Sequence, residues 1–148
     1  MFTESQGFIG EKSTTFIRLF KRELLDDINR QYLVQEYLPG YRLIGSDAAL
    51  EGIFVTPDGK VVLIPFIPLS AQYEEPLFDS VRQFLEEIDH TFRSDCSYPL
   101  HLTRIAVHPI ALGGSPTEPT NFKDAPEDIH VKAINYWNKV YVHALRNK

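Results

Sequence analysis

The stretch EGIFVTPDGKVVLIP, residues 51–65, carries the pattern that decides the fold. It predicts two β-strands, over residues 51–55 and 61–67, that pair as a hairpin. In the connection between them, Pro57 stands at a turn-opening position and Gly59 stands where a positive φ is expected. The second strand begins with VVLI, which is apolar on both faces, as in a central strand that is covered on both sides. We therefore expect this hairpin to lie in the interior of a sheet.

Upstream of the hairpin, the sequence predicts a strand, a helix and a second strand. The first strand covers residues 16–20, the helix covers about 22–32, and the second strand covers 41–45. Pro39-Gly40 ends the segment before that second strand, because proline lacks a backbone donor and glycine permits a turn. The apolar residues that share one face of the helix are Leu24, Leu25, Ile28 and Tyr32.

Downstream of the hairpin, two prolines and a helix cap mark the next boundaries. Pro65 and Pro68 restrict ladder bonding, so the second hairpin strand should end or reach a sheet edge near them. Ser80 is placed to cap the first turn of a helix while Gln83 reaches back, which is a capping box. The residues expected on the buried stripe of this helix are Val81, Phe84, Leu85, Ile88 and Phe92.

The C-terminal third is rich in proline and glycine and contains one predicted strand and one predicted helix. The strand covers residues 101–107, and the closing helix covers 127–145. Between them, residues 112–121 are expected to form a surface loop. Asp124 and Glu127 are expected to cap the helix, with Pro126 in its first turn. Its expected buried stripe is Ile134, Trp137, Val140, Tyr141 and Leu145.

Length and composition are those of one globular domain. The chain has 148 residues, of which 43% are hydrophobic and 24% are charged, so disorder and coiled coil are excluded. The element pattern predicts a single α+β domain over residues 1–148, with a mainly antiparallel twisted sheet and helices packed on one face or end.

The charge is unevenly distributed along the chain. Residues 1–95 carry 16 acidic and 9 basic side chains, a net charge of −7, whereas residues 96–148 carry 4 acidic and 6 basic, a net charge of +2. The resulting −5 argues against nucleic acid as a partner, because nucleic-acid affinity depends on clustered Lys and Arg.

The sequence also predicts no membrane segment and a reducing compartment. Its longest apolar run, residues 61–69, is far shorter than the roughly 18–20 residues that span a bilayer. The N-terminus lacks the basic and apolar regions of a secretory signal. The single cysteine, Cys96, has no partner for an internal disulfide and is expected to be a plain thiol. We therefore expect a cytoplasmic protein.

Four features follow one another in the chain: YLPGYRLIGSD at 37–47, Glu51, VLIPFIPL at 62–69 and DSVRQFLE at 79–86. In this order and spacing they resemble the SUKH superfamily. This superfamily includes the fungal cell-wall (glucan) synthesis regulators and many bacterial immunity proteins. The resemblance covers residues 5–92. Residues 93–148 then form a C-terminal extension with a loop, a strand and the closing helix.

The resemblance implies a non-enzymatic protein-binding function. It implies a bacterial immunity protein that binds and neutralises a cognate toxin, often a nuclease, without a cofactor. The alternative within the superfamily is a regulator of cell-wall synthesis that binds signalling proteins. This chain has Ala48-Ala49-Leu50 where members usually carry glycines, so it lacks their backbone freedom there. Members also usually begin with a helix, and this sequence starts after the place where that helix would lie, so either the helix is absent or the start is truncated. We expect the closing helix around Trp137 to cover the apolar surface that this helix would cover.

The expected partner surface combines tyrosines and acidic residues. Tyrosine suits an interface because it has a large ring and a polar tip, and an acidic face attracts a basic protein. The alternatives are that the tyrosines seal the rim of the core and that the acidic residues are a solvated helix face. A further alternative is a homodimer formed through the strand edge near Pro65 or the tyrosine-rich segment. The candidate partner-binding residues are Tyr37, Tyr41, Tyr73, Glu74, Glu75, Asp79, Glu86 and Glu87.

We predict no catalytic, cofactor-binding or metal-binding residues. Ser46 and Asp47 lack the surroundings of a nucleophile elbow, and we expect them to end a strand and bind local backbone. Gly113–Thr117 lacks the lysine of a phosphate-binding loop and is expected to be a turn-rich surface loop. The histidines lack metal-ligand spacing, and we expect His90, His101, His108, His130 and His143 on helix surfaces or in loops.

Overall fold

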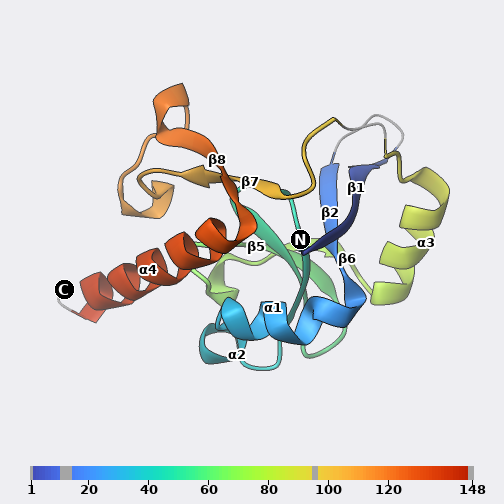
Figure 1. The fold of residues 1–148 in the computed structure, drawn as a ribbon. Helices are drawn as coiled ribbons and strands as arrows, with labels where there is room; N and C mark the ends of the chain where they lie inside the picture. Colours follow the sequence, from blue (N-terminus) through green and yellow to red (C-terminus); the bar gives the residue numbers. More distant parts are fainter. Residues whose placement is uncertain (1, 11–14, 95–96, 147–148) are drawn as a thin grey trace.

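A computed structural model describes residues 2–10, 15–94 and 97–146, and its centre is an antiparallel sheet (Figure 1). Six strands follow one another across this sheet in sequence order, so every neighbouring pair is antiparallel. The strands are β1 (Thr3–Ile9), β2 (Thr15–Phe20), β3 (Arg42–Ser46), β4 (Glu51–Val55), β5 (Val61–Pro65) and β6 (Glu75–Phe78). The α+β class and the mainly antiparallel sheet are confirmed.

The predicted hairpin is β4 and β5. Glu51 pairs with Pro65 and Val55 pairs with Val61, so the two strands match over their whole length. The turn closes through a hydrogen bond of 2.8 Å from the Thr56 N–H to the Lys60 carbonyl, and Gly59 has a φ of +87°. The strand ends at Pro65, as the loss of a backbone donor predicts.

Helices cover both faces of the sheet. Most pack on one face: α1 (Leu25–Gln31) after a short 3₁₀ turn, α2 (Val34–Tyr37) and α4 (Glu127–Arg146). The helix α3 (Val81–Thr91) packs on the other face. Successive residues of β5 accordingly alternate between two cores: Val62 and Ile64 face α1, α2 and α4, and Val61 and Leu63 face α3. The prediction that this strand is covered on both sides is confirmed.

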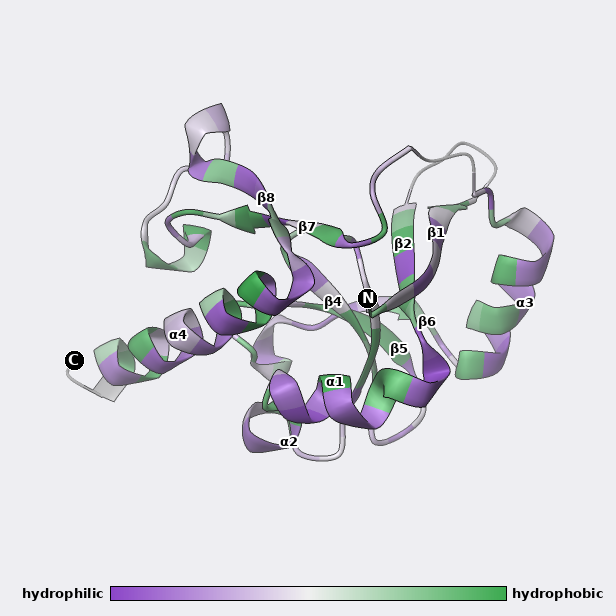
Figure 2. Ribbon diagram, viewed as in Figure 1, coloured by the Kyte–Doolittle hydropathy of each residue, from purple (hydrophilic) through white to green (hydrophobic). Residues whose placement is uncertain are grey.

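The helix α3 starts as predicted, but its buried stripe is narrower. The Ser80 hydroxyl accepts a 3.1 Å hydrogen bond from the Gln83 N–H, and the Gln83 side chain accepts one from the Asp79 N–H. Most of its hydrophobic residues face the sheet (Figure 2). Phe84 is buried, but Leu85 is 53% exposed, so its assignment to the stripe was wrong. Leu85 follows Phe84 by one residue, which turns its side chain by about 100° around the helix axis and away from the sheet.

The C-terminal part forms a second, two-stranded sheet. The predicted strand is β7 (Leu102–Ala106), and it pairs antiparallel with β8 (Phe122–Pro126), which was not predicted. The expected caps of α4 were therefore wrong. Asp124 and Pro126 belong to β8, and the Asp124 carboxylate accepts a hydrogen bond from the Tyr98 hydroxyl. Glu127 begins α4, but its carboxylate accepts hydrogen bonds from the N-terminal strand, at the Phe2 N–H and the Thr3 hydroxyl.

The buried side of α4 also differs from the predicted stripe. Val131 and Ile134 join the core on this face of the sheet, but the expectation that the helix covers the sheet around Trp137 is not met. Trp137 instead packs against His108 of the C-terminal part, with the ring centroids 5.8 Å apart. Leu145 is exposed, which corrects its assignment to the stripe. The fully buried residues of α4 are Glu127, His130, Val131, Ile134 and Asn138, of which three are polar or charged.

The strand β6 was not predicted either. Residues 75–78 pair with β5 from Val61 to Leu63, so this part of the strand edge is occupied. Pro76 and Glu75 are both exposed, and neither is typical of a strand, which explains why the pattern was missed.

Two buried polar side chains hold these layers together. Arg18, with an exposed fraction of 0%, bridges the main sheet and the C-terminal part. Its guanidinium donates to the Gln6 side chain, the carbonyls of Pro99 and Leu102, and the Thr103 hydroxyl. Each donor therefore meets an acceptor, which is what a buried guanidinium requires.

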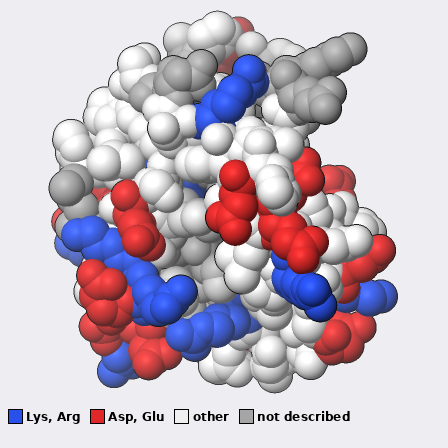
Figure 3. Space-filling model, turned by 90° about the vertical axis from the view of Figure 1, so that its right-hand side faces the viewer, with Lys and Arg blue, Asp and Glu red and all other residues white. Residues whose placement is uncertain are grey.

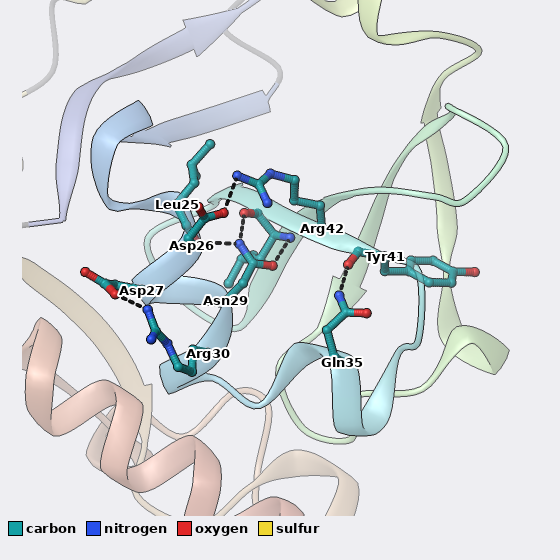
Figure 4. Close-up of polar contacts among 9 residues, drawn as sticks. Leu25, Asp26, Asp27, Asn29, Arg30, Gln35, Tyr41 and Arg42 are labelled. Atoms are coloured by element: carbon teal, nitrogen blue, oxygen red, sulfur yellow. Dashed lines mark hydrogen bonds and ion pairs between the residues drawn. The ribbon is translucent and has the colours of Figure 1, made fainter.

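The second buried polar side chain is Asn29 on α1 (Figure 4). Its amide exchanges hydrogen bonds of 2.7 and 2.9 Å with the Leu43 backbone of β3. Nearby, Gln35 accepts from the Gly40 N–H and donates to the Tyr41 carbonyl (Figure 4). These bonds fix the loop that presents Tyr41.

The remaining expectations concern single positions. Ala48 has a φ of +63°, the left-handed conformation that glycine adopts without strain. Cys96 lies outside the described residues. Within the described part of the chain, no helix has the length and apolar character needed to cross a bilayer.

Candidate functional site

A cavity of about 400 Å³ opens where the main sheet meets the C-terminal part, and we call it the seam cavity. One wall comes from the segment after β5, at Phe66, Ile67 and Pro68. The opposite wall comes from β7 and the 3₁₀ turn at Ile110–Leu112, and α4 closes the third side. Most of the lining is apolar, and cavities of this size and character take ligand groups or partner side chains.

Besides Phe66, the aromatic side chains of Tyr73, Trp137 and Tyr141 line the cavity. Trp137 and Tyr141 are four residues apart on α4, so they lie on one face of the helix. Tyr73 approaches from the segment before β6, and its hydroxyl lies 3.4 Å from that of Tyr141. Tyr73 is 41% exposed, and Ile110 is 40% exposed. A second hollow of about 210 Å³ shares Tyr73 and Tyr141 and extends along α4 to Leu145.

His130 also lines the cavity, and its surroundings keep it neutral. The Tyr32 hydroxyl lies 2.6 Å from Nδ1, and the imidazole also bonds to the Ala49 backbone. Burial lowers the pKa of His130 to about 4, and burial raises the pKa of Tyr32. The expectation that His130 lies on the helix surface was wrong. The ring packs edge-on against Phe66 at 4.9 Å and is part of the core.

A carboxylate stands in the lining of this apolar cavity. Glu51, the first residue of β4, is half-buried there. Its pKa is raised by burial, and further by the negative charges of Asp47 and Glu75. In the described part of the chain, Glu51 forms no ion pair with Lys or Arg. We call Glu51 together with Glu75, whose charge acts on it, the acidic lip.

Among the predicted partner-binding residues, Tyr73 is the one that the structure places in the lining of this cavity, and Glu74 and Glu75 follow it in the chain. The Tyr41 hydroxyl donates a 3.0 Å hydrogen bond to Glu74, which raises the pKa of Tyr41 in addition to burial. Asp79 borders a separate hollow of about 330 Å³ that Tyr41 and Glu74 also line.

Three predicted residues lie elsewhere. Tyr37 is partly buried against the core, and burial raises its pKa. Glu86 and Glu87 are on α3, across the sheet from the cavity, where Glu86 pairs with Arg82 at 3.1 Å. Figure 3 views the side that carries α3, and acidic side chains are interspersed there with Lys and Arg. The acidic face of α3 is therefore partly neutralised.

The polar groups considered for catalysis bind local backbone. The Ser46 hydroxyl accepts from the Ala48 N–H at 3.0 Å, and the Asp47 carboxylate accepts from the N–H groups of Ala49 and Glu51. This confirms the prediction for the end of β3. The Ser115 hydroxyl likewise accepts N–H groups within its own loop. Residues 2–10, 15–94 and 97–146 contain no group of three or more His, Cys, Asp and Glu that could hold a metal.

The seam cavity itself was not predicted. Trp137 and Tyr141 were assigned to a buried stripe, since spacing alone does not distinguish an aromatic that fills the core from one that lines a cavity. The signal in the sequence was the pair of aromatic residues one helical turn apart, together with an exposed tyrosine beside acidic residues. Comparison of the sequence with known protein families and with curated proteins finds no match.

Proposed function

We propose that this protein is a non-enzymatic protein-binding module and that the seam cavity with its acidic lip is where the partner docks. Its partner is a basic toxin domain, often a nuclease, which it neutralises in the cytoplasm as a bacterial immunity protein. The observation that carries the proposal is the open, aromatic-lined apolar cavity that adjoins unpaired carboxylate charge.

The cavity supports binding because it matches the anatomy of an interface. A few aromatic side chains around an apolar pocket supply most of the affinity in protein complexes. Tyr73, Trp137 and Tyr141 provide such a cluster, and Tyr73 is already 41% exposed in the free chain. Ile110, which lines the cavity and is 40% exposed, adds apolar surface that a partner would cover.

The polar groups near the cavity support a role other than catalysis. A histidine that acts as a general base needs a ring nitrogen within reach of the substrate, but the hydrogen bonds of the His130 ring go to Tyr32 and Ala49. Ser46 and Asp47 are engaged with backbone N–H groups, as a capping turn requires.

The charge supports a basic partner. Negative charge at the rim of a binding site steers a positively charged protein towards it and repels acidic proteins. The acidic lip lies directly beside the aromatic residues, so steering and anchoring would act on the same part of the partner. The resemblance of residues 5–92 to the SUKH superfamily is consistent with this assignment.

Co-expression with a toxin tests the proposal. The toxin to be tested is the C-terminal domain of any larger protein that a neighbouring gene encodes, and growth is the measurement. The wild-type chain should restore growth, and Trp137→Ala should abolish protection while circular dichroism shows an intact fold. The control is Leu85→Ala, an exposed residue on α3, which should protect fully. Absence of protection, or full protection by the folded Trp137→Ala variant, would contradict the proposal.

A further inference from the structure

We propose that the seam cavity recognises a specific pair of neighbouring residues on its protein partner: a large apolar side chain that fills the cavity and a lysine or arginine that pairs with Glu51. This inference deepens the proposed function and rests on it.

The apolar half of the pair follows from the lining. Ile67, Pro68, Ile105 and Ile134 present only carbon atoms from their side chains, and His130 is neutral and hydrogen-bonded. A charged group placed deep in such a site would lose its hydration without a partner. An aromatic or branched apolar side chain gains about 25 cal/mol for each Å² of apolar surface removed from water. The interior of the cavity therefore selects an apolar group.

The cationic half follows from Glu51. Its carboxylate is half-buried and close enough to Asp47 and Glu75 for their charges to act on it. Within the described residues Glu51 forms no ion pair, so no Lys or Arg side chain compensates the negative charge of its carboxylate. A cation at this position gains attraction to three carboxylates and relieves their mutual repulsion. Glu51 lies in the lining of the cavity, which places the cation beside the apolar group.

The aromatic residues favour the same pair. Tyr73, Trp137 and Tyr141 line the same cavity, and aromatic rings attract a lysine or arginine that approaches their faces. The same charges disfavour other occupants. Anionic lipid head groups would be repelled by the acidic lip, and a second copy of the chain would bring a net charge of −5 against it. A basic protein segment meets both the apolar and the electrostatic requirement.

Capped dipeptides separate the two halves of the proposal. The probes are N-acetylated amides of Phe-Lys, Phe-Gln, Phe-Glu and Ala-Lys. The readout is the fluorescence of Trp137, the single tryptophan of the chain, which lines the cavity. We expect Phe-Lys to bind about tenfold more tightly than Phe-Gln, the difference that about 1.4 kcal/mol of charge pairing produces. Phe-Glu should bind more weakly than Phe-Gln, and Ala-Lys should give no saturation.

A pair of matched variants assigns the preference to Glu51. Glu51→Gln should lower the affinity for Phe-Lys to that for Phe-Gln and leave Phe-Gln unchanged. Glu86→Gln, which removes one carboxylate from α3, should change neither. Equal affinities of the wild-type chain for Phe-Lys and Phe-Gln would overturn the inference. Toxin protection that requires Trp137 would then still support the proposed function, so the two failures are distinguishable.

Discussion

Arg18 shows how much of this structure depends on a single side chain. Its five N–H donors reach backbone and side-chain acceptors in both the main sheet and the C-terminal part. Arg18→Lys should lower the free energy of unfolding by roughly 2–4 kcal/mol, because an ammonium does not reproduce the planar fork and leaves buried acceptors unpaired.

Urea unfolding measures the effect. The matched control is Arg30→Lys, an exposed arginine paired with Asp27 on α1, which should change the free energy of unfolding by less than about 0.5 kcal/mol. If Arg18→Lys matched the control, Arg18 would not be the link between the two parts.

His130 predicts a pH dependence of stability. Burial lowers its pKa from 6.5 to about 4 in the folded state, so the unfolded chain binds the proton more readily. Stability is therefore lost as the pH falls from 6.5 towards 4. Between pH 7 and pH 5 this group should account for a loss of about 2 kcal/mol.

The comparison of wild type with His130→Gln isolates this contribution. The wild-type chain has to be compared with the variant because other groups also titrate in this range. Burial raises the pKa of Asp47 and of Glu51, and a carboxyl group with a raised pKa adds stability as the pH falls. The wild-type chain should lose more stability than the variant over this pH range, measured by urea unfolding. As a check on the intact chain, the His130 imidazole should remain neutral by NMR at pH 5. A proton bound there at pH 6 would contradict the assignment.

The hydrogen bonds of a single side chain could be predicted where its partners lie in the same turn of the chain. Ser46 and Asp47 bind the backbone of their own turn, and short-range chemistry was sufficient to predict it. Arg18 and His130 are buried against partners 84 and 98 residues away in the chain, at Leu102 and Tyr32. Pattern alone does not predict burial of such side chains, because it depends on where those partners fold.

At the scale of elements, α3 offers a test within two adjacent residues. Phe84 is 1% exposed and belongs to the core between α3 and the sheet, whereas Leu85 is 53% exposed. Phe84→Ala should cost about 3–5 kcal/mol through lost burial and the cavity left behind, and Leu85→Ala should cost less than about 0.5 kcal/mol. Thermal and urea unfolding of both variants measure the difference. Equal losses would mean that α3 is rotated on the sheet.

The elements that were predicted have strong periodicity or a clear cap, as in β4, β5, α3 and α4. Three strands were missed, β1, β6 and β8. The last two are short, and each contains a proline and charged residues. Their strand conformation comes from pairing with β5 and β7 rather than from their own composition. Tertiary pairing therefore overrides the local preference in both.

At the scale of the whole molecule, the binding site exists because distant segments meet. No single segment that lines the seam cavity has a binding signature of its own. The cavity forms where three of them meet: residues 65–68, the turn that follows β7, and the helix α4. The sequence identified Tyr73, Glu74 and Glu75 as partner-binding candidates from composition and position. It placed equal weight on Glu86 and Glu87, which lie across the sheet, because a linear pattern does not distinguish the two faces.

Binding at the acidic lip should also depend on pH. The raised pKa of Glu51, caused by burial and by Asp47 and Glu75, means that its charge is lost at a higher pH than that of an ordinary glutamate. The preference for Phe-Lys over Phe-Gln should therefore decline as the pH falls, starting above the ordinary value of 4.5. Dipeptide titrations of wild type and Glu51→Gln measure this, and a pH-dependent preference in the variant would contradict the assignment to Glu51.

The central claim is that the protein binds its partner at the seam cavity. The most direct measurement is an NMR chemical-shift map of the full chain during titration with the Phe-Lys probe. The account predicts that the largest shifts cluster at Glu51, Ile67, Tyr73, Ala133 and Trp137, which line the cavity from three separate segments. Largest shifts on α3, around Glu86 and Glu87, would contradict it.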